Sequence, residues 1–205
     1  MLSRSLLAGA TLVSAFVSAQ TYPNQTAPFS LKIVSADNAT LNGASLFACH
    51  EGAAIEGLCN AGQITTVPTD ASLFTFNYSA ASTVENADAG ATGYLTYLLQ
   101  ASGVNVSEPL ELTMLESSNV AHPIFSPSEV GTAVAFDSKN LLNIQSYIDD
   151  TVTPPVAGAF KAYYRWYICM TYFGGYTYQT LNWVLGSYPP QNPSCQKVDI
   201  QRVFA

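Results

Sequence analysis

The side chains of this sequence with the most obvious capacity for chemistry are a few glutamates. Glu108, Glu111 and Glu116 lie close together in the chain, and two carboxyl groups at a suitable separation can hydrolyse a glycosidic bond. Glu111 falls on the polar parity of an alternating segment, so we interpret the three as the solvated face of a strand. Since there is no Gly-x-Ser-x-Gly elbow and no glycine-rich phosphate loop, the sequence favours a non-catalytic protein and assigns no catalytic residue.

The two histidines, His50 and His122, are the next candidates. They are far apart in sequence and no Cys-x-x-Cys motif accompanies them, so we predict no metal site and no cofactor. A Ser/His/Asp triad with either histidine lacks an evident nucleophile. His50 follows Cys49 directly, which would suit a ligand contact beside a disulfide-braced loop. We favour the alternative, a structural imidazole that hydrogen-bonds a turn carbonyl.

Aromatic residues concentrate at 160–188, and aromatic faces with polar tips suit stacking against sugar rings. The predicted platform consists of Tyr167, Tyr176, Tyr178, Arg165 and Asn182. The competing interpretation packs these side chains beneath the C-terminal strand and the 186–194 loop. We prefer the packing interpretation, because large aromatic residues are mostly buried or half-buried.

The platform must be positioned by a β-hairpin. Gly174-Gly175 can take positive φ at both positions of a two-residue turn, which is a strong hairpin signal. With that turn Phe173 faces Tyr176, Trp166 faces Trp183 and Ile168 faces Leu181. The tryptophan pair and its neighbours then share one face, which we interpret as core. The opposite face carries the platform residues together with Cys169, Thr171 and Thr180.

The remaining elements also follow period-2 patterns, at 29–34, 74–79, 110–114 and 198–204. Such runs between Gly, Asn, Asp and Pro clusters predict strands. The fold class we predict is all-β, a mostly antiparallel sandwich or barrel with two disulfides, and a β-trefoil is the alternative. We expect one short helix within 140–150. Thr153-Pro154-Pro155 is expected to link two halves of the domain.

The N-terminus has the parts of a secretory signal peptide. Arg4 precedes an apolar run from Leu6 to Val17 that ends in small residues before Gln20. We therefore predict a signal peptide at 1–19, an N-terminal arm at 20–28 and a single β domain at 29–205. Four sequons predict N-glycosylation of an exported protein, at Asn24, Asn38, Asn77 and Asn105.

Charge excludes two classes of partner. The net charge is −7 and charged residues make up only 10% of the chain. Nucleic acids and anionic membranes are both bound by clustered Lys and Arg, so neither partner is expected.

The four cysteines predict two disulfides in an oxidising compartment. Three connectivities are possible. We favour Cys49–Cys59 with Cys169–Cys195, because each closes a short loop within one half of the chain.

The two ends of the mature chain resemble a family of secreted fungal proteins that carry a domain of unknown function. The similar segments are Pro28-Phe29-x-Leu31, Leu41-Asn42-Gly43, His50-Glu51-Gly52-Ala53, the 163–169 strand Tyr-Tyr-Arg-Trp-Tyr-Ile-Cys, and Pro193-Ser194-Cys195-x-Lys197-Val198-Asp199-Ile200. The resemblance implies fungal origin, secretion, an all-β fold and a Cys169–Cys195 bridge. It implies no activity.

These observations leave three functions. The first is a secreted, extracellular, non-catalytic module at the cell wall or a host surface, which binds a cell-wall polysaccharide or an extracellular protein. The second is a small acidic secreted hydrolase, which would need two carboxylates in a cleft. The third is a structural wall protein with neither cleft nor aromatic patch. We favour the first.

Overall fold

The structure is a computed structural model that describes residues 22–62, 69–79, 88–101 and 103–204. Within these ranges the protein is all-β, with one short 3₁₀ helix, η1 (Asp70–Ser72). None of its described helical segments is long and apolar enough to cross a membrane. The strands are β1 (Asn24–Gln25), β2 (Phe29–Val34), β3 (Leu46–Gly52), β4 (Ile55–Asn60), β5 (Phe74–Tyr78), β6 (Thr92–Ala101), β7 (Val104–Met114), β8 (Val120–Phe125), β9 (Val134–Phe136), β10 (Leu142–Asp149), β11 (Val156–Tyr163), β12 (Trp166–Phe173), β13 (Tyr176–Val184), β14 (Gln196–Lys197) and β15 (Asp199–Phe204).

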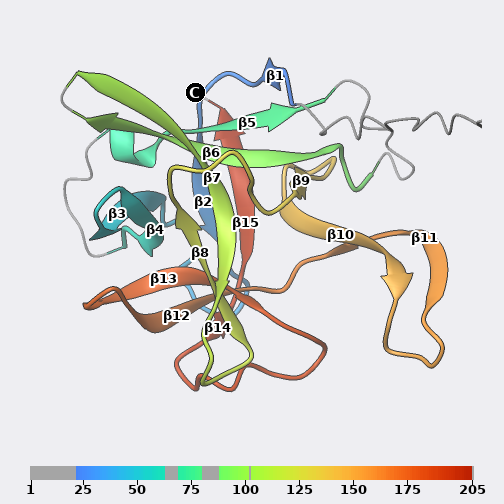
Figure 1. The fold of residues 1–205 in the computed structure, drawn as a ribbon. Coiled ribbons are helices and arrows are strands. Elements are labelled where there is room, and N and C mark those ends of the chain that lie inside the picture. The colour runs from blue at the N-terminus through green and yellow to red at the C-terminus, as the bar shows by residue number, and fades with distance from the viewer. Residues whose placement is uncertain (1–21, 63–68, 80–87, 102, 205) are drawn as a thin grey trace, which may run out of the picture.

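All strand pairings are antiparallel, and they run in the order β11-β10-β9-β6-β7-β8-β4-β13-β12-β14 (Figure 1). β5 joins this path through β6, and β2 links β5 to β15. The path does not close on itself, so neither the barrel nor the β-trefoil, which is built on one, describes the fold. The all-β, antiparallel prediction is confirmed.

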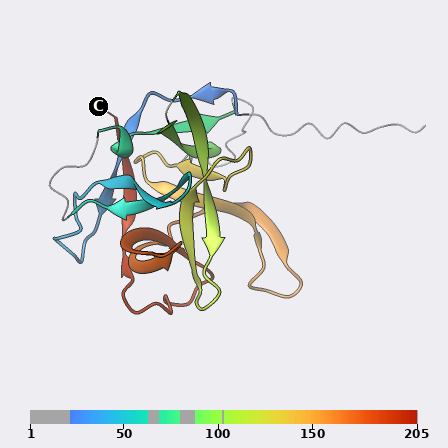
Figure 2. The same ribbon diagram turned by 60° about the vertical axis from the view of Figure 1, so that its left-hand side comes forward.

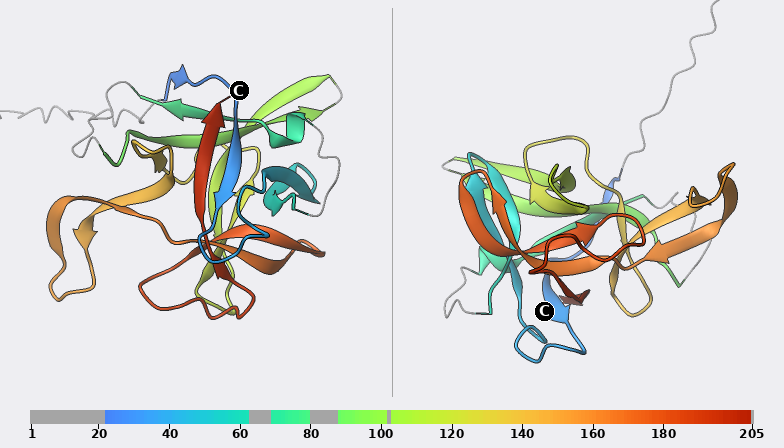
Figure 3. Two further views of the ribbon diagram at one scale, coloured as in Figure 1. Left: turned by 180° about the vertical axis from the view of Figure 1, so that it is seen from behind. Right: turned by 90° about the horizontal axis from the view of Figure 1, so that it is seen from below.

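One apolar core lies between two parts of this bent network. β2, β5 and β6 supply one side through residues such as Phe29, Phe74 and Leu95, and the β12–β13 hairpin supplies Trp166 and Leu181 to the other. In β2 the predicted alternation is confirmed, because Phe29, Leu31 and Ile33 are all fully buried. β15 pairs with β2 along its whole length (Figures 1 and 3).

The β12–β13 hairpin has the predicted register. Phe173 pairs with Tyr176, Ile168 with Leu181 and Trp166 with Trp183. Both glycines of the turn have positive φ, +58° at Gly174 and +97° at Gly175, as a two-residue hairpin turn of this kind requires.

Two predictions for 140–155 are wrong. The expected helix within 140–150 is strand β10, which pairs with β9 and β11. Ile144 and Ile148 are spaced four apart, a spacing that suits both a helix face and one face of a strand. The 153–155 segment lies between β10 and β11, so it connects the two strands of a hairpin rather than two halves of the domain. That hairpin projects from the body of the molecule in each view (Figures 1 and 2).

The two disulfides are Cys49–Cys59 and Cys169–Cys195, the pairs favoured from the sequence. The first ties β3 to β4. The second ties β12 to the segment before β14, whose residues pair with Tyr167 and Ile168. Two disulfides are consistent with an extracellular protein.

Removal of the Cys169–Cys195 bridge should lower the free energy of unfolding by about 3 kcal/mol, because its 26-residue sequence separation restricts the unfolded chain. Chemical denaturation of the Cys169→Ser/Cys195→Ser variant measures this. A loss below about 1 kcal/mol would contradict this contribution of the bridge to stability.

The predicted signal peptide lies outside the described residues. Part of the predicted N-terminal arm forms β1, where Asn24 and Gln25 pair with Tyr78 and Asn77 of β5. None of the four sequon asparagines is buried, and Asn105 is the most open of them, on the exposed end of β7. Their glycosylation stays a prediction.

Candidate functional site

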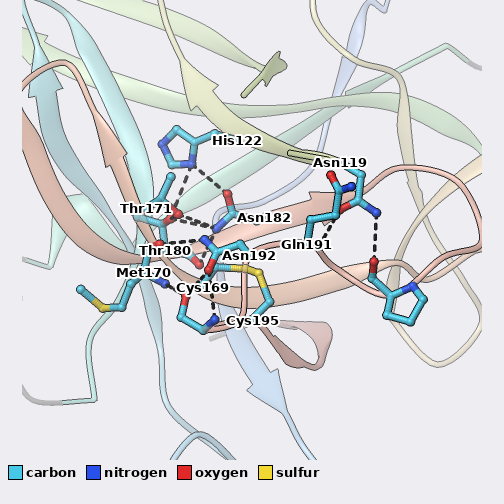
Figure 4. Close-up of a disulfide and its surroundings, with 12 residues drawn as sticks. Asn119, His122, Cys169, Met170, Thr171, Thr180, Asn182, Gln191, Asn192 and Cys195 are labelled. Atoms are coloured by element: carbon cyan, nitrogen blue, oxygen red, sulfur yellow. Dashed lines mark hydrogen bonds between the residues drawn. A yellow bond between two sulfur atoms is a disulfide. The ribbon is translucent and has the colours of Figure 1, made fainter. Parts of the chain in front are cut away.

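The second face of the β12–β13 hairpin forms a polar interior rather than an open platform. Thr180 and Asn182 are fully buried and Thr171 is 4% exposed. Asn182 Nδ2 donates to Thr171 Oγ1 and to the Thr180 carbonyl, both at 3.0 Å. The opposing side of this cluster comes from β8 and β3, which contribute His122 and Glu51. We call these five residues the polar interior (Figure 4 shows its hairpin side and His122).

A carboxyl–imidazole pair lies at the centre of the polar interior. His122 Nε2 is 2.6 Å from Glu51 Oε2, and the two side chains are 0% and 3% exposed. His122 Nδ1 is 3.3 Å from Asn182 Oδ1. The Thr180 carbonyl can only accept a hydrogen bond, so the Asn182 atom that faces it is the amide nitrogen. The Asn182 amide oxygen therefore faces His122 and accepts, which means that His122 Nδ1 carries a proton. One further proton then lies between Nε2 and the carboxyl group, and the pair has no net charge in either arrangement.

Two glycines make room for Glu51. A Cβ atom at Gly57 of β4 would lie 2.5 Å from the Glu51 carboxyl carbon. A Cβ atom at Gly174 would lie 2.2 Å from the Glu51 backbone oxygen, so the tip of the β12–β13 hairpin rests directly on β3. The β3–β4 register also shifts between His50 and Gly52. Such an irregularity re-aims side chains locally.

An open groove of about 350 Å³ runs beside this interior, along the Cys49–Cys59 disulfide. We call it the aromatic groove. It is lined by Phe47, Ala48, Cys49, His50, Cys59, Asn60, Ala71, Tyr178 and Gln179. No carboxylate, lysine or arginine is among the lining residues that the structure describes. Their only ionisable groups are the His50 imidazole and the Tyr178 hydroxyl.

Three rings form a row, and its two outer members, His50 and Tyr178, line the aromatic groove. The Tyr176 and Tyr178 rings are stacked, with centroids 5.7 Å apart and planes 16° from parallel. The exposed His50 ring meets Tyr176 edge-on at 5.4 Å. Asn60 Nδ2 donates to Gln179 Oε1 at 2.8 Å, and Gln179 Nε2 makes no hydrogen bond to another described residue. The groove therefore combines aromatic faces with uncommitted polar groups.

The structure separates the five residues of the predicted platform. Tyr178 lines the aromatic groove, and Tyr176 stacks against it. Tyr167 lies under the Lys197 ammonium, 5.6 Å from it, and the Arg165 guanidinium stacks on Tyr163 at 4.7 Å. Asn182 belongs to the polar interior, where no ligand can reach it.

Sequence reasoning ranked His50 below the tyrosines and missed Asn60 and Gln179 as groove residues. His50 was suggested by its place beside Cys49, and the structure puts it against Tyr176 on the groove wall. Asn60 and Gln179 carry no local sequence signal. They meet because Cys59 of β4 pairs with Thr180 of β13.

The prediction of a solvated face holds for two of the three glutamates. Glu111 and Glu116 are exposed, but Glu108 is fully buried, so the prediction of a solvated face is wrong for it. The Glu108 side chain meets that of Glu56, which is 7% exposed. Burial and the neighbouring Glu56 raise the pKa of Glu108 to about 8.

Among the described residues, the one cluster of potential metal ligands is Cys49, Cys59 and Glu51. Both sulfurs belong to the disulfide. Because cysteine binds metal as a thiolate, this cluster offers no metal site.

A more charged groove of about 430 Å³ lies around Asp137, Asp199 and Tyr164. Its central carboxylate already has local partners. Asp137 Oδ1 accepts from two backbone N–H groups, and Asp137 Oδ2 accepts from the Tyr164 hydroxyl at 2.8 Å. Burial and this hydrogen bond raise the pKa of Tyr164 to about 12. We interpret this groove as structural.

Comparison with known proteins identifies a family but no activity. Neither a search of curated proteins nor a search of solved structures gives a match. A family model with the description "Domain of unknown function (DUF7907)" matches residues 26–204. That range contains both disulfides, the polar interior and the aromatic groove. The protein therefore belongs to the family of the domain of unknown function DUF7907.

Proposed function

We propose that the protein is a secreted, non-catalytic binding module that holds an uncharged glycan in the aromatic groove. The row of rings formed by His50, Tyr176 and Tyr178 beside that groove carries this proposal. Sugar rings present apolar C–H faces that pack on aromatic rings, and their hydroxyl groups hydrogen-bond amides such as Gln179. A volume of about 350 Å³ is at the lower end of small-ligand sites, which suits one or two sugar units.

The lining of the groove favours a neutral glycan over a charged one. Its described lining residues include no carboxylate, lysine or arginine, so they offer no charged partner to a uronic acid or to an amino sugar cation. Secretion, cell-wall or host-surface location and fungal origin are supported by the N-terminal signal pattern, the four sequons and the resemblance at both chain ends. An extracellular protein is the alternative partner.

The other two functions have less support. Hydrolysis needs carboxyl groups that reach the substrate. The paired Glu56 and Glu108 are buried, and they line neither the aromatic groove nor the Asp137 groove. A structural wall protein needs neither a groove nor a row of aromatic rings.

Binding of the secreted, glycosylated protein to insoluble polysaccharides tests the proposal. The panel contains chitin, β-glucan, mannan, cellulose and pectin. We expect retention on one uncharged polymer, and we expect Tyr178→Ala to weaken it about tenfold or more through the loss of ring contact.

Two tyrosines of the same hairpin serve as matched controls. Tyr172 is 70% exposed and lies outside the groove, so Tyr172→Ala should bind as the wild type does. Tyr167→Ala should also bind, because Tyr167 packs against Lys197 instead. Retention on pectin alone, or equal losses in all three variants, would contradict the proposal.

A further inference from the structure

The pair formed by Glu56 and Glu108, which we call the acid pair, is placed at the end of a strand. β8 lies between β4 and β7, and Phe125, its last residue, pairs with Glu56 on one side and with Leu110 on the other. Glu108 is two residues from Leu110, so it points to the same face of the sheet. Glu108 lies beyond the end of β8, so the side chain of Glu56 can reach it past Phe125.

The surroundings of the acid pair do not compensate a negative charge. Neither ion pair between described residues involves Glu56 or Glu108. No N–H or O–H group of any other described residue donates to Glu56 Oε2 or to either carboxyl oxygen of Glu108. The neighbours from other elements are Phe125 of β8 and Tyr97 of β6, which pairs with Glu108. Asp70 of η1 approaches Tyr97 and adds a further negative charge. His50 pairs with Glu56 across the β3–β4 hairpin, but its ring contacts Tyr176 instead of the acid pair.

Two carboxylates cannot both remain ionised in such a place without large cost. With a proton between them, one carboxyl group donates to the other and both charges are reduced to one shared charge. The raised pKa of Glu108, to about 8, agrees with this arrangement. The raised pKa of Tyr97 has the same origin, since burial and then the carboxylates of Glu56 and Glu108 disfavour the phenolate.

We propose that the acid pair is an acid-dependent latch, which holds the β3–β4 hairpin against the β6–β7 ribbon while one proton is shared and releases it when that proton is lost. The latch concerns the aromatic groove because β3 and β4 supply its His50, Asn60 and disulfide wall. Only this consequence for ligand binding rests on the proposed function. The latch itself can be tested without a ligand.

The sign of the pH effect follows from proton uptake. An unfolded Glu108 titrates near its ordinary value of 4.5, whereas the folded pKa is raised to about 8. Between these values the folded protein binds more protons than the unfolded chain, so the stability falls as the pH rises. The contribution is complete below about pH 4.5 and is lost by about pH 8.

Thermal unfolding from pH 4.5 to 8.5 tests the latch, in the wild type and in Glu108→Gln. The glutamine amide can donate to Glu56 at every pH, so it imitates the protonated pair. We expect the wild-type Tm to fall by roughly 5–15 °C more than that of Glu108→Gln over this range, and the variant to be the more stable protein at pH 8.5. The titration of all other groups affects both proteins equally, so it cancels when their Tm values are subtracted.

Glu111→Gln, a change at an exposed glutamate of the same strand, is the matched control and should follow the wild type. If Glu108→Gln does not fold, Glu56→Gln provides the same comparison. The carboxyl ¹³C titration of Glu108 in the wild type needs no variant and should show a midpoint well above 6. A midpoint near 4.5, or equal pH dependence of Tm in wild type and variant, would overturn the proposal.

Hydrogen exchange and binding separate the latch from the proposed function. With a functional latch, amides of β3 and β4 exchange faster at pH 8.5 than at pH 5 after correction for the intrinsic rate, and Glu108→Gln removes this difference. If the polysaccharide found above is retained equally at both pH values while exchange changes, the latch stands and its control of the groove is wrong. Unchanged exchange contradicts the latch whatever the binding result.

Discussion

Glu51→Ala is expected to lower the free energy of unfolding by about 3–5 kcal/mol, because it removes one partner of a buried, charge-compensated pair. His122 is fully buried and loses its 2.6 Å contact with the carboxyl group. Its Nδ1 must still carry a proton for Asn182. The substitution would then leave Nε2 buried without its carboxyl partner. Urea denaturation at pH 6 and pH 8 measures the loss.

Glu51→Gln shows whether the stability lost in Glu51→Ala comes from the hydrogen bond to His122 or from the loss of side-chain packing. The glutamine amide can donate to an unprotonated Nε2 while Nδ1 still donates to Asn182, so both ring nitrogens of His122 keep a partner. We expect Glu51→Gln to cost clearly less than Glu51→Ala. Glu111→Ala, at an exposed site, should change stability by less than about 0.5 kcal/mol. Equal losses in Glu51→Ala and Glu111→Ala would show that the pair does not stabilise the fold.

Trp166→Ala is expected to cost about 3–5 kcal/mol, the amount typical of removing a buried tryptophan side chain. Trp166 is fully buried, and its ring centroid lies 4.7 Å from that of Trp183 across the hairpin. Its Nε1 donates to the Leu142 carbonyl at 2.8 Å. The substitution therefore leaves both a cavity and an unpaired buried acceptor, and it loosens the hairpin from β10.

Trp166→Phe separates these two effects. The phenyl ring fills much of the cavity but donates no hydrogen bond, so the remaining loss should be about 1–3 kcal/mol. Tyr188→Ala is the control, because Tyr188 is 81% exposed. Thermal and chemical unfolding should agree on the order Trp166→Ala, Trp166→Phe, Tyr188→Ala. A Trp166→Ala loss no larger than that of Tyr188→Ala would contradict the assignment of this face to the core.

The sequence alone was enough to predict β2 and the β12–β13 hairpin, because alternation and turn residues determine these elements locally. Gly174-Gly175 permits only a narrow set of turns, and this fixed the pairing of every residue in the β12–β13 hairpin. Alternation in 29–34 identified β2 and its buried face. The 140–150 segment was wrong because the spacing of Ile144 and Ile148 fits both periodicities, and its pairing with β9 and β11 decided between them.

The candidate sites depended on contacts between distant strands, which no pattern in one sequence reveals. The polar interior joins Glu51 of β3, His122 of β8 and Asn182 of β13. No sequence pattern around any of the three indicates a buried hydrogen-bond network. Glu108 follows the exposed Asn105–Ser107 sequon and precedes exposed Glu111, so its solvated interpretation was reasonable for an isolated strand. It is buried because it pairs with Tyr97 of β6 and lies just beyond the end of β8, where the side chain of Glu56 meets it.

The most direct test of the aromatic groove is an NMR titration of the ¹⁵N-labelled protein with soluble oligosaccharides of the polymer that retains it. We predict saturable shift changes at the backbone amides of Asn60, Tyr178 and Gln179, at the side-chain amides of Asn60 and Gln179, and at the His50 ring, all of which line the groove. We predict none at Tyr167 or at Tyr188. Saturable changes confined to residues outside the groove, or no change at millimolar oligosaccharide, would contradict the assignment of glycan binding to this site.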